Sequence, residues 1–550
     1  MKIQKGKLNL KLTQIFLIIL LVNGINTSKC GADKLKLKPA IINSTNIYDK
    51  KATASGYQPI KIGADFTSFT KPNSMDTNIF NKVKNLILDT FEEFQKFLKT
   101  QHQDIDLSGH YKTIKERCEI DEIASDYKNF LKTNDIIVFP TFDNSLDEGV
   151  IAAAGHCLTS DTGRPVAGTL LINPKLSFDI VNTETYMKNL LLHEITHILI
   201  FSPYLFSSLG MLSSKNSVYY VTSPKALLKA RQHFNCGTLN GIPLENQGGK
   251  GSVGSHWEAR YMLGDYMIST VYYDNTISDI TLALFEDSGF YQVNYYSGGL
   301  FKFGKNKGCG FINQKCIVNG KPISDEFCTQ PDEPKCLQTR TYKGFCSVRD
   351  YSLYGYKIPT EYQYFSNPNY GGFIAANFCP IADADNSDTD FYPESCKIGT
   401  STLHSDYGEK IGDNSFCFVS SLLPKSSTQK VTSQSICYEV QCNSEKENII
   451  VKIGSTSVTC PTSGGTMTVD GFSGSITCPK YSEICDFKKN VVCNEMFDCL
   501  SKKVEVDPDS YEFDEDDENF SIIKTRYRSN SNNLKKRNLI TLFLLLIYLF

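Results

Sequence analysis

The sequence has few of the features that would place it in several common protein classes. Its 57 Lys and Arg against 60 Asp and Glu leave a formal net charge of −3, so no basic excess indicates a nucleic-acid partner. No two of its 19 cysteines form a C-x-x-C unit, which argues against a zinc ribbon. No internal repeat is visible, and only 8 of 550 residues are histidine. A cluster of histidines in this chain is therefore informative.

Neither end carries an apolar run of the roughly 20 residues that a spanning helix needs. At the N-terminus, four lysines precede the apolar run 15–22 and small polar residues follow it, which is typical of a secretory signal peptide. At the C-terminus, twelve almost wholly apolar residues, 539–550, follow a short polar spacer, which is typical of a glycosylphosphatidylinositol (GPI) anchor signal. We predict a GPI-anchored chain at the cell surface. A tail that stays in place and a secreted product are the alternatives.

Cysteines are sparse in the first half of the chain, and fifteen of the 19 lie between residues 309 and 499. In an exported chain this density predicts disulfides formed in an oxidising compartment. The odd number leaves one thiol over, and Cys30 is the candidate because it stands alone near the start. Asn43 and Asn519 begin sequons that could accept glycans, so we expect a glycoprotein.

The order of predicted elements is that of an α+β protein. Apolar residues at helical spacing predict helices at 78–98 and 186–201, the second with Asn182 or Thr183 as its N-cap. Strands are expected between them, at 136–139 and 168–172. After residue 300 the sequence is rich in Cys, Gly, Tyr, Asn and Ser, which predicts a cross-linked, loop-rich region with short strands such as 448–453.

His193 and His197 lie four residues apart in the second predicted helix, so both imidazoles leave the same face. Zinc binds neutral imidazole, and a catalytic site uses three protein ligands and keeps a position for water. Glu194 can take a proton from that water, because zinc lowers its pKa from about 15.7 to about 7. The alternative is a pair of core histidines, each of which would need a hydrogen-bond partner in an apolar helix.

A third ligand should come from a segment that folds back over this helix. His256 is the best candidate because it adjoins the only tryptophan of the chain, and Met267 follows eleven residues later. A methionine in a tight turn beneath the metal marks the metzincins, although a methionine by itself is more often a core residue. The other histidines are His102, His110, His156, His233 and His404.

The chain resembles the leishmanolysin family of GPI-anchored surface metallopeptidases within the metzincins. The resemblance runs from about residue 57 to residue 499, and 58 residues separate His197 from His256, as in a family with a long insertion at this point. It rests on Cys157 with Asp161, on 163–168 (Gly-Arg-Pro-Val-Ala-Gly), on Asn173-Pro174, on His193-Glu194-x-x-His197 with Phe201-Ser202, on 254–260 (Gly-Ser-His-Trp-Glu-x-Arg), on Met267 and on 469–479.

The resemblance implies roles for these residues. It implies one zinc ion per chain held by His193, His197 and His256, with Glu194 as the general base and Met267 in the Met-turn. It also implies the disulfides Cys118–Cys157 and Cys236–Cys309. A pro-segment cysteine blocks the zinc in this family, and Cys30 is the candidate here, although the histidines that the family usually places around it are missing.

The resemblance also implies the architecture: an α+β, metzincin-type catalytic domain with the HExxH active-site helix, followed by a disulfide-rich, loop- and strand-rich C-terminal domain. The predicted parts are a signal peptide (1–27), a short pro-segment or linker (28–56), an N-terminal catalytic subdomain (57–200), a central subdomain with the third ligand and Met-turn (201–300), a cysteine-rich domain (301–500), an acidic stalk (501–533) and a GPI-type tail (534–550).

The sequence departs from the metzincin pattern at Ile200, where a glycine normally lets the chain turn sharply. A β-branched residue with positive φ would be strained, so either the turn is displaced or the site is strained.

The predicted function is that of a zinc metalloendopeptidase acting on proteins or peptides at the cell surface, with a role in cell adhesion. Its substrate would lie along an edge strand, with 168–172 as the candidate. The alternative is a surface adhesion or binding protein that keeps the zinc and no longer cuts. Ile200 favours this alternative and the intact Glu194 opposes it. Nothing in the sequence indicates an oligomer.

Overall fold

The computed structural model describes residues 29–30, 38–42, 56–146, 150–175, 184–247, 252–270, 272, 275–295, 301–384, 394–399, 404–443 and 445–485. The predicted signal peptide, most of the pro-segment, both sequons, both N-cap candidates, the acidic stalk and the anchor tail lie outside the described residues. The described part is a mixed helix-and-strand protein with a disulfide-rich C-terminal half, as expected from the sequence.

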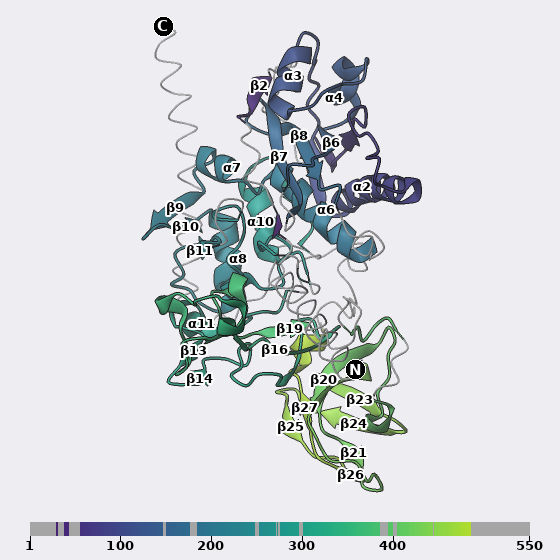
Figure 1. Cartoon of the computed structure of the whole chain (residues 1–550), viewed down its shortest axis with the longest axis vertical. Helices are drawn as coiled ribbons and strands as arrows, with labels where there is room; N and C mark the ends of the chain where they lie inside the picture. The colour runs from purple at the N-terminus through teal and green to yellow at the C-terminus, as the bar shows by residue number, and fades with distance from the viewer. Residues whose placement is uncertain are drawn as a thin grey trace, which may run out of the picture.

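A six-stranded sheet lies at one end of the elongated molecule (Figure 1). Its order is β1-β7-β8-β6-β4, and β2 also pairs with β7. The strand β7 is antiparallel to β8, whereas β4, β6 and β8 are mutually parallel. The strands are β1 (Lys29–Cys30), β2 (Ala40–Ile42), β4 (Ile62–Ala64), β6 (Ile136–Phe142), β7 (Val150–Ser160) and β8 (Pro165–Ile172).

The expectation that 168–172 forms an edge strand is wrong. These residues belong to β8, which pairs with β6 on one side and with β7 on the other. All eight residues of β8 are buried, and such a run indicates a strand covered on both faces but does not fix its place in the sheet. The outer antiparallel strand is β7. Among the described residues, β1 and β2 pair with its two ends and no strand pairs with 153–157 on that side.

Two long helices pack against one another and against this sheet (Figure 1). They are α2 (Thr77–Phe97) and α6 (Glu184–Leu199), each within two residues of its predicted position, so both predictions are confirmed. Asp76 caps α2 by accepting from the amides of Asn78 and Ile79. Gly168 of β8 allows α6 to approach closely, because a Cβ there would lie 2.3 Å from Cγ2 of Ile198.

Short elements surround the two long helices. Three strands form one small sheet, β3 (Tyr57–Pro59), β5 (Leu98–Gln101) and β12 (Tyr291–Val293), and three form another, β9 (Leu212–Lys215), β10 (Val218–Val221) and β11 (Ile242–Pro243). The shorter helices are α3 (Tyr111–Cys118), α4 (Phe130–Thr133), α7 (Pro203–Ser208), α8 (Pro224–Phe234), α9 (Ala259–Met262), α10 (Asp279–Asp287), α11 (Gly308–Asn313) and α12 (Tyr481–Ile484).

One hydrophobic core runs from Ile60 to Ile381 and includes the apolar side of α6. It therefore crosses residue 300, and the first cysteine-rich segment, 301–384, packs on the same core as the histidine helix. This segment contains β13 (Ile317–Val318), β14 (Lys321–Pro322), β15 (Pro334–Cys336), β16 (Lys343–Cys346), β17 (Arg349–Asp350), β18 (Tyr370–Gly371), β19 (Ala382–Ala384) and the 3-10 turns η5 (Tyr351–Tyr354), η6 (Thr360–Tyr362) and η7 (Ile374–Ala376).

A second six-stranded sheet, the terminal sheet, lies at the opposite end of the molecule and has its own hydrophobic cluster (Figure 1). Its order is β24-β23-β22-β20-β27-β25, and every pairing is antiparallel. It comprises β20 (Ser415–Ser420), β22 (Gln434–Asn443), β23 (Asn448–Ile453), β24 (Thr456–Cys460), β25 (Gly465–Met467) and β27 (Ile476–Cys478), with a ribbon of β21 (Leu423–Pro424) and β26 (Phe472–Ser473) beside it. The strand predicted at 448–453 is confirmed.

Eight disulfides link cysteines of the described chain. The two pairs that the family resemblance implied, Cys118–Cys157 and Cys236–Cys309, are among them. The others are Cys316–Cys379, Cys328–Cys346, Cys336–Cys417, Cys396–Cys437, Cys442–Cys485 and Cys460–Cys478.

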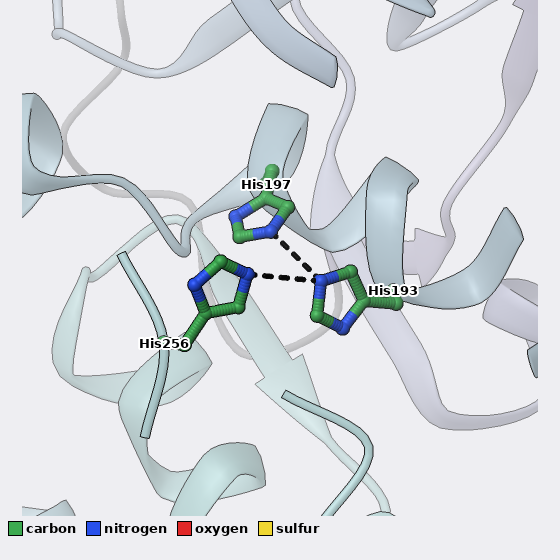
Figure 2. A group of neighbouring side chains, drawn as sticks. All are labelled: His193, His197 and His256. Atoms are coloured by element: carbon green, nitrogen blue, oxygen red, sulfur yellow. Dashed lines mark hydrogen bonds between the residues drawn. The ribbon is translucent and has the colours of Figure 1, made fainter. Parts of the chain in front are cut away.

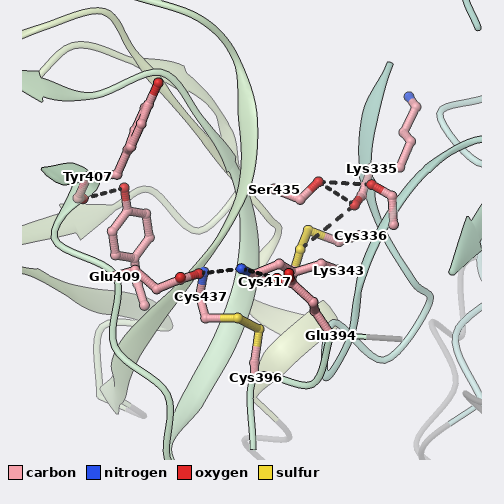
Figure 3. A network of polar contacts seen from close by, with 12 residues as sticks. Lys335, Cys336, Lys343, Glu394, Cys396, Tyr407, Glu409, Cys417, Ser435 and Cys437 are labelled. Atoms are coloured by element: carbon pink, nitrogen blue, oxygen red, sulfur yellow. Dashed lines mark hydrogen bonds and ion pairs between the residues drawn. A yellow bond between two sulfur atoms is a disulfide. The ribbon is translucent and has the colours of Figure 1, made fainter. Parts of the chain in front are cut away.

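A buried ion-pair network joins the terminal sheet to the main body, residues 56–384 (Figure 3). The Nζ atom of Lys343, whose side chain is 2% exposed, lies 2.5 Å from Oε2 of Glu394 and 2.7 Å from Oε1 of Glu409. The amide of Cys437 in β22 donates to the same Glu409 oxygen at 3.0 Å. The disulfides Cys336–Cys417 and Cys396–Cys437 lie beside this network, so covalent and ionic links coincide at the joint.

Among the described residues, the stretch from Glu184 to Ser208 is long and apolar enough to cross a membrane, judged by length and composition alone. It contains α6, and 78% of the apolar window is buried inside the protein. Its apolar character therefore matches its place in the core.

Candidate metal centre

Three histidines from two distant segments meet in the interior (Figure 2). His193 and His197 come from one face of α6, and His256 comes from the loop before α9. The Nε2 atom of His193 lies 3.0 Å from that of His197 and 3.2 Å from that of His256. Among the described residues, this is the one group of three His, Cys, Asp or Glu side chains whose ligand atoms all lie within 4.8 Å of one another.

Backbone carbonyls fix the other nitrogen of each ring. Nδ1 lies 2.6 Å from the carbonyl oxygen of Tyr266 in His193, and 2.7 Å from that of Phe201 in His197. In His256, Nδ1 lies 3.1 Å from the carbonyl oxygen of Ser252. A carbonyl oxygen can only accept, so each Nδ1 carries the hydrogen and each neutral ring has its lone pair on Nε2.

The three lone pairs therefore point at one another with no proton between them. The nitrogen–nitrogen contacts in Figure 2 would need a hydrogen that the carbonyls hold on Nδ1. Converging lone pairs repel unless a cation lies between them, and three imidazoles are the donor set that zinc prefers. These residues fit a zinc ion.

Burial keeps the three rings neutral. Loss of hydration lowers the pKa of His193 to about 4 and that of His256 to about 3. The same cause holds the pKa of His197 well below its usual value. A neutral imidazole is the form that binds a metal ion, so at neutral pH no deprotonation has to precede binding.

Glu194 lies on α6 directly after His193 and is fully buried. Two residues later on the helix, the hydroxyl of Thr196 is hydrogen-bonded to the hydroxyl of Tyr266 at 3.0 Å. The acid that the sequence assigns as the base thus lies on the same helix as two of the three histidines, inside the protein rather than on its surface.

Met267 lies in a tight turn that links both histidine segments. It is fully buried, and the amide of Trp257, next to His256, donates to its carbonyl at 2.9 Å. The preceding residue, Tyr266, holds Nδ1 of His193. The turn is closed by a hydrogen bond of 3.2 Å from the amide of Ile268 to the carbonyl of Asp265.

Asp265 is a residue of this turn that the sequence analysis did not single out. One of its oxygens accepts from the amide of Met267 at 2.8 Å, and the other accepts from the hydroxyl of Thr281 at 2.8 Å. Thr281 in turn accepts from the indole nitrogen of Trp257 at 2.8 Å. Burial raises the pKa of Asp265 to about 6. The signal available in the sequence was an acid two residues before Met267, a spacing typical of a side chain that caps its own turn.

The chain leaves α6 without backbone strain at Ile200, which the sequence left as one of two alternatives. Ile200 is not among the described residues with positive φ. Instead, the amides of Ile200 and Phe201 both donate to the carbonyl of Thr196 at 2.9 Å, and the carbonyl of Phe201 then faces His197. The strained alternative is wrong, because a wider final turn replaces the left-handed residue.

The remaining histidines of the described chain do not join the cluster. His102 pairs with Asp135 at 3.0 Å, and His233 lies 2.8 Å from the carbonyl oxygen of Phe303. His156 lies in β7 with its ring 5.4 Å from that of Tyr204. The backbone of Cys30 lies in β1, where it pairs with Ala152 of β7.

A helix that carries His-Glu-x-x-His, with a third histidine delivered from far along the chain, is the arrangement of metallopeptidase centres. The chain belongs to the leishmanolysin family, because residues 98–491 match the family model described as leishmanolysin. The resemblance inferred from the sequence is thereby confirmed.

Individual relatives agree with this assignment. A leishmanolysin homolog of Crithidia fasciculata is 30% identical over 368 residues, which cover 61% of this chain and 53% of that protein. Leishmanolysin of Leishmania tropica is 27% identical over 397 residues, which cover 66% and 58%. A leishmanolysin-like peptidase of Caenorhabditis briggsae is 27% identical over 449 residues, which cover 64% and 66%. The chain thus spans little more than half the length of the first two relatives.

Proposed function

We propose that this chain is a zinc-dependent metalloendopeptidase that hydrolyses peptide bonds in proteins. The observation that carries the proposal is the convergence of three neutral imidazoles, each with its lone pair on Nε2, one residue away from a buried glutamate. A zinc ion bound there would polarise the scissile carbonyl and lower the pKa of a water molecule to about 7.

The residues of the chain divide the remaining work. His193, His197 and His256 hold the ion, and the carbonyls that accept from their Nδ1 atoms fix the ring orientations. Glu194 takes a proton from the attacking water and passes it to the leaving amine. Met267 supports the turn beneath the site. Cys30 is the cysteine that would block the zinc until the pro-segment is removed.

The outer strand β7 is the better candidate for substrate binding, in place of β8. Residues 153–157 of β7 have no strand partner on the side away from β8 within the described part of the chain. An extended peptide can pair with such an edge through main-chain hydrogen bonds. Because α6 packs against β7 as well as β8, a peptide on this edge would lie beside the helix that carries the histidines.

The proposal includes export to the cell surface, a GPI-type anchor and a role in adhesion, which rest on the terminal sequences and the family resemblance. The alternative of a non-cleaving zinc protein has lost its support, because it rested on strain at Ile200 and that residue is not in the left-handed region. The acidic residue of the His-Glu-x-x-His motif is also present, as Glu194, and a purely structural zinc site would not need this carboxylate.

The test is Glu194→Gln in the processed, purified protein. Removing a general base should lower casein cleavage by about 10²- to 10⁴-fold, while metal analysis still finds one zinc per chain. Glu92→Gln, an exposed glutamate on α2, is the matched control and should keep full activity. Undiminished, chelator-sensitive cleavage by Glu194→Gln would falsify the assigned role.

A further inference from the structure

Two of the three histidines lie on a helix, whereas His256 lies in a loop and depends on other contacts for its position. It belongs to the middle one of three short paired segments, which are 243–245, 256–258 and 267–269. The first segment pairs with the middle one through an antiparallel bridge between Leu244 and Trp257. The third pairs with it through a parallel bridge between Trp257 and Ile268. The position of His256 therefore depends on how these three segments are held together.

Glu245 uses both its backbone and its side chain to hold this loop. Its amide donates to the carbonyl of His256 at 2.9 Å, and its own carbonyl accepts from the amide of Gly254 at 2.8 Å. In the carboxylate, Oε1 accepts from the amide of Gln247 at 2.7 Å, and Oε2 accepts from the hydroxyl of Ser269 at 2.9 Å. Glu245 is only 2% exposed. Hydrogen bonds to both oxygens of a buried carboxylate fix the orientation of its side chain.

The hydrogen bond between Glu245 and Ser269 crosses the segment that carries His256. Trp257 is bridged to the first segment on one side and to the third on the other. Glu245 and Ser269 each lie one residue beyond a bridged position, so their side chains share the face away from Trp257. This one hydrogen bond therefore joins the two outer segments across the middle one.

The same hydrogen bond connects the supports of two metal ligands. Ser269 follows Tyr266 by three residues, and the carbonyl oxygen of Tyr266 lies 2.6 Å from Nδ1 of His193. On the other side, the amide of Glu245 donates to the carbonyl of His256. The contact between the outer segments therefore bears on the separation of the two rings, whose Nε2 atoms lie 3.2 Å apart (Figure 2).

We propose that Glu245 is a positioning residue of the metal centre. Its carboxylate ties the segment after the methionine turn to the loop of His256, and so keeps His256 at a distance from His193 that one zinc ion can bridge. Hydrogen-bonded groups that orient the ligands of a metal typically change its affinity by about 10- to 100-fold. This inference rests on the proposed zinc site, and in this role Glu245 contacts neither the zinc nor the substrate.

The test is the zinc affinity of the processed, purified protein, measured by competition with a chromogenic chelator. Glu245→Ala removes both carboxylate hydrogen bonds and should weaken zinc binding by about 10- to 100-fold. Because Ser269 acts through the same hydrogen bond, adding Ser269→Ala to Glu245→Ala should cause little further loss. Glu245→Gln should recover most of the affinity, since its amide can accept from Gln247 and donate to the oxygen of Ser269. Losses that simply add in the double variant would overturn the shared role.

Asp135→Ala is the matched control for a general loss of stability. Asp135 is 5% exposed, accepts from the amide of Lys61 at 2.8 Å and lies 3.0 Å from Nδ1 of His102, but it is outside the three segments. This variant should lower the urea midpoint and leave zinc affinity unchanged. If Glu245→Ala behaves in the same way, Glu245 only supports the fold and the proposal is wrong.

Hydrogen exchange of the metal-free protein separates failure of this inference from failure of the proposed function. In Glu245→Ala the amides of 252–258 should exchange faster than in the wild type, whereas those of α6 should not. That result supports the role of Glu245 even if the wild type binds no zinc, an outcome that would reject the proposed function. Zinc-dependent cleavage by the wild type, with unchanged zinc affinity and unchanged exchange in Glu245→Ala, leaves the peptidase proposal intact and rejects the positioning role.

Discussion

The main body (56–384) and the terminal sheet (404–485) are stabilised in different ways. The main body contains four disulfides, but it is built on one large apolar core in which residues 189–199 of α6, Trp257 and Met267 are almost wholly inaccessible to solvent. The terminal sheet has a small core of its own. Two disulfides cross-link it internally, one ties it to the main body, and one ties it to the segment 394–399. A small unit buries too little apolar surface to be stable alone, so covalent links compensate.

This difference matches the position of the candidate metal centre. The three histidines are at most 6% exposed, and their orientation depends on backbone carbonyls that the large core holds in place. Within the described residues, the terminal sheet contributes no member of the metal-binding group. Apolar packing therefore positions the site, and cross-links attach a second unit to it. Each prediction below disturbs one of these two kinds of stabilisation.

The largest expected effect is in the main body, for Ile200→Gly. This change restores the glycine of the metzincin pattern, but Ile200 is fully buried and does not use positive φ. The loss of a buried side chain together with the glycine penalty should lower the free energy of unfolding by about 5 kcal/mol. Urea denaturation measures it. A variant as stable as the wild type, with higher activity, would show that the site is strained after all.

The next effect is at the joint, for Lys343→Met. It leaves Glu394 and Glu409 without their shared cation, and Glu409 is 1% exposed in its side chain. Removing one partner of a buried ion pair should cost about 3–5 kcal/mol. Hydrogen exchange should show the loss first in β20 and β22.

The control for the joint is Lys410→Met, which breaks a much more exposed pair with Glu439. It should cost less than about 1 kcal/mol. If the two lysine variants lose the same stability, the buried network contributes nothing beyond a surface pair.

Local patterns in the sequence were sufficient to predict the two long helices and much of the candidate metal centre. The amphipathic spacing of α2 and the motif on α6 both depend on residues within a few turns of one another. His256 could be chosen because a tryptophan and a later methionine accompany it. The structure explains this choice, since Trp257 and Met267 are hydrogen-bonded to one another.

What the sequence could not predict depends on pairing between distant segments. The interior position of β8 follows from its two neighbours, and its own eight residues do not reveal them. A small pocket beside His193 brings Asn189 of α6 together with Asn275, which lies beyond the methionine turn. Neither asparagine belongs to a motif, so only the fold makes them neighbours.

A smaller effect concerns the cross-links. Replacing Cys460 and Cys478 by alanine opens a bond with a sequence separation of 18 and should cost about 3 kcal/mol on a chain-entropy estimate. The loss should be confined to β24, β25 and β27, while zinc content and peptide cleavage stay at wild-type values. Hydrogen exchange with mass spectrometry locates the change. Loss of zinc in this variant would mean that the two regions are not independent.

The smallest effect appears only in acid and concerns His156 in β7. Burial lowers its pKa from 6.5 to about 4 in the folded protein. Folding therefore favours the neutral form of His156. Its contribution to the free energy of unfolding is complete above pH 6.5 and is lost as the pH falls toward 4. At pH 5 the loss should be about 2 kcal/mol relative to pH 7.5.

His156→Phe removes this titration and keeps an aromatic ring against Tyr204. Its stability should therefore fall by about 2 kcal/mol less than that of the wild type between pH 7.5 and pH 5. Urea titrations at the two pH values measure the difference, with His110→Gln, a half-buried histidine outside the sheet, as the control. If the wild type and His156→Phe lose the same stability in acid, this ring is not held neutral in the folded protein.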